Sequence, residues 1–185
     1  MPLGHEERPE FFARLTKTAD RRETVVREVA RTFIAFLRSH GVEAKQHGSW
    51  TQRIALPDSD CDISCPNDLN LEKTKEAVLR VQSRQEFVIQ EEVSEWRLLI
   101  RGRHGVLLDV TQKAMHHTEP YHKAEHIMTS VNSAVDENVR LAVLVVKLWV
   151  RKHIQTFQPK DGYPNAYTFL LIFLFLCTHR GLLYL

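Results

Sequence analysis

The feature that most constrains this chain is the segment 47–63, in which ten residues separate the pair Gly48-Ser49 from Asp60, and Asp62 follows two positions later. Residues two apart in a β-strand point to the same face of the sheet. The two carboxylates would therefore lie side by side and repel each other, unless a cation sits between them. Hard oxygen ligands of this kind suit Mg²⁺, which usually also binds phosphate oxygens of a substrate.

The Gly-Ser pair suggests a place for that phosphate. Gly48 has no side chain, so the backbone there can approach a phosphate closely. Ser49 offers a hydroxyl and a backbone N–H, and N–H groups at the start of a helix bind phosphate readily. Metal ligands and a phosphate-binding turn on one short segment predict nucleotidyl transfer.

Further residues extend this prediction along the chain. Asp109 follows an apolar run that begins at Val106, and acids are almost never fully buried unless they are paired. A third carboxylate there would complete a site for two Mg²⁺ ions. Lys147 and Arg151 are four residues apart, so they share one face of a predicted helix. Both are cations of the kind that would hold a triphosphate.

Taken in order, these residues resemble the signature of the DNA-polymerase-β-like nucleotidyltransferases. Within that superfamily they are most similar to the non-canonical poly(A) polymerases and terminal uridylyltransferases. The resemblance covers roughly residues 20–180. It is carried by Gly48, Ser49, Leu56, Pro57, Asp60, Asp62, Asp109, Lys147, Arg151, Ala166 and Tyr167.

The resemblance implies a template-independent enzyme that adds UMP from UTP to an RNA 3′ end. It implies that Asp60, Asp62 and Asp109 are both the catalytic residues and the ligands of Mg²⁺ or Mn²⁺. The expected partners are the RNA 3′ end and a nucleoside triphosphate, UTP or ATP. The resemblance also implies which residues bind the nucleotide: Gly48, Ser49, Lys147, Arg151 and Tyr167. Tyr167 is expected to stack on the base.

Several positions depart from the family pattern. Arg53 stands where a glycine is usual, and Ala166 replaces a serine that contacts phosphate. By count, Glu125 and His126 occupy the place of an Asn-Ser pair that binds the ribose. Two alternatives therefore stay open: a non-canonical poly(A) polymerase that uses ATP, and a non-catalytic, truncated paralogue that binds RNA or a protein partner. An oligoadenylate synthetase type usually has a longer chain and a different helical companion, so it ranks lower.

Hydrophobic periodicity predicts an α+β fold, with a small mixed sheet and a helical second domain. Residues 1–20 are expected to form a flexible N-terminus, and residues 21–115 a nucleotidyltransferase catalytic domain. Residues 116–185 would begin a helical, poly(A)-polymerase-like central domain that is incomplete. The predicted helices span 23–39, 71–80, 136 onward and 166–179, and the predicted strands 42–47, 61–64, 87–90, 96–101 and 106–111.

Composition adds the setting. The net charge is only +2, so charge alone does not indicate a nucleic-acid-binding protein. Three scattered cysteines argue against a disulfide framework and for an intracellular location, with cytoplasm and mitochondrion undistinguished. The apolar run Phe169–Cys177 is far shorter than the roughly 20 residues that a membrane span needs. It is expected to be a buried helix, and the apolar C-terminal surface to be covered by a protein partner.

Overall fold

The computed structural model describes residues 7–65, 70–84, 86–112, 138–153, 162, 164 and 166–181. Glu125 and His126, which stand in the place of the ribose-binding pair, lie outside the described residues. So does the expected domain boundary at residues 115/116.

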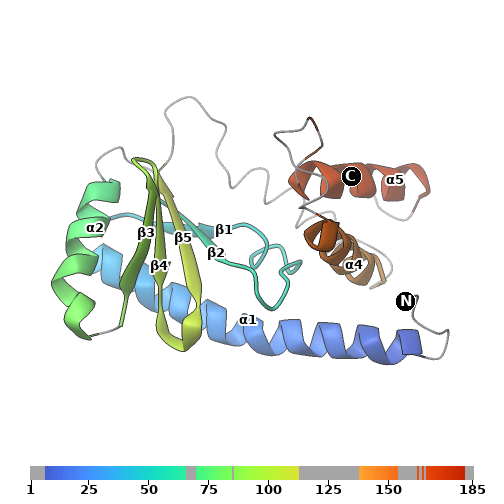
Figure 1. Ribbon diagram of the computed structural model, residues 1–185, viewed down its shortest axis with the longest axis horizontal. Helices are drawn as coiled ribbons and strands as arrows, with labels where there is room; N and C mark the ends of the chain where they lie inside the picture. The colour runs from blue at the N-terminus through green and yellow to red at the C-terminus, as the bar shows by residue number, and fades with distance from the viewer. Residues whose placement is uncertain are drawn as a thin grey trace.

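The centre of the fold is a five-stranded mixed sheet with the strand order β1-β2-β5-β4-β3 (Figure 1). β2 and β5 are parallel neighbours, and the other three pairs are antiparallel. The strands match the predicted positions closely, which confirms the α+β class. Their bounds are β1 Lys45–His47, β2 Cys61–Cys65, β3 Val88–Ser94, β4 Arg97–Arg101 and β5 Leu107–Gln112.

One face of this sheet is covered by two helices, α1 (Glu7–Ser39) and α2 (Asn70–Val81). Two short 3₁₀ segments follow: η1 (Gln82–Arg84) comes directly after α2, and η2 (Arg103–Gly105) lies between β4 and β5. The apolar residues of each strand alternate, so one face of the sheet is apolar and packs on the helices. The core formed there is lined by Val26, Val29, Ala30, Phe33 and Leu37 of α1, Leu71 and Val78 of α2, and Cys61, Ile63, Leu98, Ile100, Leu108 and Val110 of the strands.

Helix α1 is longer than the sequence predicts. It begins at Glu7, so most of the segment expected to be a flexible N-terminus is helical. Figure 1 shows this half of α1 running past the sheet toward α4. Ala19 is buried there, and Asp20 accepts a hydrogen bond of 2.7 Å from Nη2 of Arg140 in α4. This tertiary contact supports a stretch whose own apolar periodicity is weak.

Helices α4 (Asn138–His153) and α5 (Ala166–His179) pack against each other at the opposite end of the molecule from α2 (Figure 1). A second apolar core joins them to the loop that follows β1. Ile54 of that loop is buried among residues of both helices: Val139 and Val143 of α4, and Leu170, Leu174 and Cys177 of α5. The predicted buried helix is therefore present, although only one side of it is covered by described residues.

No helix among the described residues combines the length and the apolar character that crossing a membrane requires.

Candidate active site

The three predicted acids gather on the face of the sheet that lies away from α1 and α2. Asp62 of β2 pairs in register with Asp109 of β5, and on its other side with His47 of β1. Residues directly opposite each other on neighbouring strands share a face. Asp60 lies two residues before Asp62, and its charge acts on that of Asp62. The strand register thus brings together three carboxylates that are far apart in the sequence.

Gly48 lies directly against this cluster. Its φ is +77°, in the left-handed region that glycine adopts without penalty. A Cβ atom built at this position would be only 1.9 Å from Oδ2 of Asp62, and 2.6 Å from Cγ. No other residue fits here without moving the carboxylate, so the glycine is required for two independent reasons.

The segment after Gly48 is a series of turns rather than the helix start that the sequence suggests. The backbone N–H of Ile54 donates to the carbonyl of Ser49 at 3.0 Å, which closes a wider loop than a helical turn. The N–H of Ser49 donates to the carboxylate of Asp62. This donor therefore lies at the acidic cluster, where it already interacts with an anionic group.

Negative charge is crowded around the carboxylate of Asp62. Burial, together with the neighbouring carboxylates of Asp60 and Asp109, raises the pKa of Asp62 to about 7. The charge of Lys147 and the N–H of Ser49 act in the opposite direction. An acid whose charge is this unfavourable in the protein alone is a strong candidate for binding a cation.

Asp109 forms an ion pair with Arg97. Both of its carboxylate oxygens accept hydrogen bonds from Arg97 of β4, at 2.8 Å from Nε to Oδ1 and at 2.7 Å from Nη2 to Oδ2. The carboxylate is largely buried, and its hydrogen bond with the guanidinium raises the pKa of Arg97. The sequence places Arg97 only in a general basic cluster, without this pairing.

These contacts decide how well a divalent metal would fit. The donor chemistry is suitable, because three carboxylates are hard oxygen ligands. In the described part of the chain, however, no three His, Cys, Asp or Glu side chains are already arranged as a metal site. Asp60 and Asp62 fit the role directly. Asp109 fits it only after at least one of its oxygens is released from Arg97.

Helix α4 presents its predicted basic pair to the same region. Nζ of Lys147 donates to the carbonyl of Ile54 at 2.8 Å, and Nη1 of Arg151 donates to the carboxylate of Asp58. Burial, together with the charge of Arg151, lowers the pKa of Lys147 to about 8, although the charges of Asp62 and Asp60 favour its protonated form. Both cations are thus brought to the loop that carries the Gly-Ser and aspartate motifs.

Arg53, which replaces a family glycine, keeps the backbone conformation of one. Its φ is +58°, which costs an L-residue about 1–2 kcal/mol. Its carbonyl accepts a hydrogen bond of 2.7 Å from Nε of Arg140, which helps to hold this conformation. The side chain is exposed, so the arginine does not clash within the turn.

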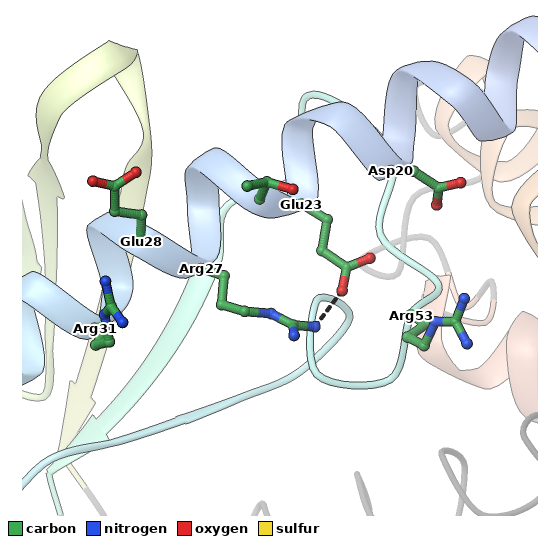
Figure 2. Close-up of a pocket in the computed structure, with 7 residues that line it drawn as sticks. Asp20, Glu23, Arg27, Glu28, Arg31 and Arg53 are labelled. Carbon is green, nitrogen blue, oxygen red and sulfur yellow. Dashed lines mark hydrogen bonds and ion pairs between the residues drawn. The ribbon is translucent and has the colours of Figure 1, made fainter.

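The same side chain lines a surface hollow with a volume of about 780 Å³ (Figure 2). Figure 2 shows Arg53 facing α1, with Glu23 and Arg27 joined by an ion pair. The charged residues around it are three acids and three arginines, so their charges balance. This hollow lacks the concentration of positive charge that would bind a phosphate.

Tyr167, predicted to stack on a base, lies in the first turn of α5 and is 40% exposed. Burial of part of the ring raises its pKa. Its role as a stacking residue stays a prediction.

Three contributors to this region were missed by sequence reasoning: Arg97, His47 and Ile54. The signal for Arg97 was present, since a hairpin with its turn at residues 102–105 places Arg97 diagonally across from Asp109. His47 follows likewise from the pairing of β1 with β2, and partial burial lowers its pKa. No sequence pattern identifies Ile54, because its contacts are with α4 and α5, which are distant in the sequence.

Comparison with known proteins supports this reading of the fold. No family model matches the sequence, and no curated protein matches it. Solved structures do match. A cytoplasmic RNA terminal U-transferase has a TM-score of 0.68 at 18% identity, over 90% of this chain and 52% of that protein. Terminal uridylyl transferase 4 from Trypanosoma brucei has a TM-score of 0.62 at 13% identity, over 83% and 49%.

The Cid1 poly(U) polymerase, solved with MgGTP bound, has a TM-score of 0.68 at 18% identity, over 91% of this chain and 55% of that protein. This chain spans about half the length of the structures it matches. At these identities the likeness concerns the fold. The chain therefore shares the fold of these terminal uridylyltransferases over most of its length.

Proposed function

We propose that this protein is an RNA 3′-terminal nucleotidyltransferase that adds UMP from UTP without a template. The observation that carries the proposal is the row of three carboxylates on one face of the sheet, bordered by Gly48 and Lys147. The hollow beside Arg53 has balanced charges, so it does not offer a comparable set of groups for phosphoryl chemistry. The similarity to uridylyltransferases supports UTP over ATP.

In this proposal Asp60, Asp62 and Asp109 hold Mg²⁺ or Mn²⁺. Bound there, the metal would neutralise charge on the α-phosphate and lower the pKa of the attacking 3′-hydroxyl. Gly48 keeps the space beside Asp62 clear, and Ser49 directs its N–H into that space. Lys147 and Arg151 would hold the triphosphate, and Tyr167 would stack on the base.

The direct test is extension of a labelled RNA primer with UTP or ATP in the presence of Mg²⁺ or Mn²⁺. Incorporation of UMP in preference to AMP supports the proposal. Preference for ATP would instead support a non-canonical poly(A) polymerase. One specific observation favours the alternative of a non-catalytic, truncated paralogue: both carboxylate oxygens of Asp109 already accept hydrogen bonds from Arg97. Binding of RNA without any incorporation would support that alternative.

We expect Lys147→Ala to weaken binding of the triphosphate more than binding of RNA. The amine would contact the β- or γ-phosphate, which internal RNA does not present, and a hydrogen bond to a charged group is worth about 1.5–3 kcal/mol. Titration of each variant with UTP and with a short RNA measures the two affinities. Lys152→Ala is the matched control, because Lys152 is exposed on the same helix. Equal losses for UTP and RNA would assign Lys147 to a general basic surface.

We also propose that the outer side of α5 is normally covered by another protein, and that the isolated chain self-associates through this side of the helix. Leu171, Ile172, Phe175 and Leu176 are between 42% and 65% exposed, and their spacing places them on one side of the helix. Contiguous apolar surface of this kind promotes association. The double change Ile172→Lys and Phe175→Lys should therefore reduce self-association of this chain, measured by light scattering.

The control is Leu79→Lys, because Leu79 is 53% exposed on α2, away from this surface. It should leave self-association unchanged. Association of the double variant at the wild-type level would exclude the α5 surface as its cause.

A further inference from the structure

Within the acidic cluster, Asp109 lies between a like charge and an opposite one. On β2 its neighbour in register is Asp62, and on β4 its diagonal neighbour is Arg97, which pairs in register with Thr111. The two hydrogen bonds to Arg97 use one oxygen each, at 2.8 and 2.7 Å. This is the bidentate geometry that makes arginine–carboxylate pairs strong.

The exposures of the two partners differ. The side chain of Asp109 is 10% exposed, whereas that of Arg97 is 41% exposed. The carboxylate is therefore fixed in the sheet, while the guanidinium lies at the more exposed border of the cluster and has access to solvent. A partner that competes for Asp109 has only to displace the arginine.

A divalent cation could compete with Arg97 for Asp109 because it carries more positive charge than the guanidinium. Asp60, Asp62 and Asp109 bring three negative charges together, and Arg97 interacts with all of them. Arg97 thus performs, in the protein alone, part of the neutralisation that a divalent cation would perform. A cation that bound all three acids would need the oxygens that Arg97 now occupies.

We propose that Arg97 is a built-in counter-ion which competes with the divalent metal for Asp109, so that pairing with Arg97 and metal ligation by Asp109 exclude each other. Arg97 then stabilises the metal-free protein and weakens its affinity for the metal. It is a positioning residue that acts through Asp109. The inference rests on the proposed function only in taking the acidic cluster as the metal site.

The test is binding of Mn²⁺ to the metal-free chain, without nucleotide or RNA, measured by titration calorimetry or by the EPR signal of free Mn²⁺. Arg97→Gln should bind Mn²⁺ about tenfold or more tightly than the wild type, because a charge-assisted bidentate contact no longer competes. It should also melt at a lower temperature in EDTA. Arg97→Lys, which keeps the charge and loses the fork, should fall between the two.

The matched control is Arg101→Gln. Leu99 of β4 is the residue that pairs in register with Asp109. Arg97 lies two residues before Leu99 and Arg101 two residues after it, where Arg101 pairs with Leu107. The substitution Arg101→Gln therefore removes the same charge at a comparable distance along the strand, without a contact to Asp109. A second control adds Asp109→Asn to Arg97→Gln, which should erase the gain in affinity.

A purely structural role for Arg97 would leave Mn²⁺ affinity unchanged or weaken it, and either result overturns the inference. An equal gain from Arg101→Gln would overturn it too, because net charge alone would then explain the effect. If Arg97→Gln fails to fold, Arg97→Lys still decides between tighter and unchanged binding. Absence of Mn²⁺ binding in every variant would refute the metal site of the proposed function together with this inference.

Discussion

Replacing Asp62 by Asn should abolish nucleotide transfer while making the metal-free protein more stable at pH 8. In the proposed function Asp62 would hold the metal, and loss of this ligand would remove several kcal/mol of charge stabilisation in the transition state. Each 1.36 kcal/mol is a factor of ten in rate, so we expect activity to fall at least about 10³-fold. Asp60→Asn should have a similar effect on activity.

The gain in stability follows from the pKa of Asp62, about 7 in the folded protein against 3.8 for an ordinary aspartate. The folded state therefore binds the proton more tightly than the unfolded state. Ionisation of Asp62 costs nothing below pH 4, costs progressively more as the pH rises, and reaches its full cost above pH 7. Since one pKa unit corresponds to 1.36 kcal/mol, the full cost is on the order of 4 kcal/mol.

Thermal unfolding in EDTA at pH 8 and near pH 4 measures this effect. Asp62→Asn should melt higher than the wild type at pH 8, and the difference should vanish toward pH 4. Glu91→Gln is the control, because Glu91 is an exposed acid on β3 and should change neither stability nor activity. Activity retained by Asp62→Asn would refute the catalytic assignment, and destabilisation at pH 8 would refute the account of charge crowding.

Replacing Gly48 by Ala should cost both activity and stability, although the change adds a single methyl group. The new Cβ would meet Oδ2 of Asp62 at 1.9 Å, so the carboxylate or the turn must move. Misplacement of a catalytic group by about 1 Å can cost about 10²-fold in rate. The positive φ adds strain of about 1–2 kcal/mol for any residue with a Cβ.

Gly41→Ala separates these two effects. Gly41 has nearly the same backbone conformation, with φ of +71° against +77° for Gly48, and no atom lies within 4 Å of a Cβ built there. It should lose only the stability that backbone strain accounts for, and keep its activity. Denaturant unfolding and primer extension of both variants give the comparison. Equal losses in the two variants would show that the contact with Asp62 is unimportant.

Much of this protein can be predicted from the sequence because the relevant signals are local. Strands such as Cys61–Cys65 and Leu107–Gln112 are short apolar runs bounded by turn residues, and α4 and α5 follow from helical periodicity. The acids Asp60 and Asp62 are recognisable because a spacing of two has a direct meaning in a strand. The fold that these elements predict is the one that the structure adopts.

Other features depend on contacts between segments distant in the sequence. The first turns of α1 are helical where the sequence suggested a flexible terminus, and Asp20 there is held by Arg140, 120 residues away. The pairing of Arg97 with Asp109 depends on the register of β4 against β5, and a shift by one residue would turn Arg97 to the other face.

The sequence by itself therefore determined which acids, glycine and lysine this protein contributes to its site, because residue type and local spacing carry that information. Only the tertiary structure decided which groups these residues contact. Two carboxylates lie close to that of Asp62, the backbone N–H of Ser49 donates a hydrogen bond to Asp62, and Arg97 forms an ion pair with Asp109. The physical reason is that charge interactions depend on distance in space and on burial. Neither quantity can be read from positions along the chain until the strands are paired and the helices packed.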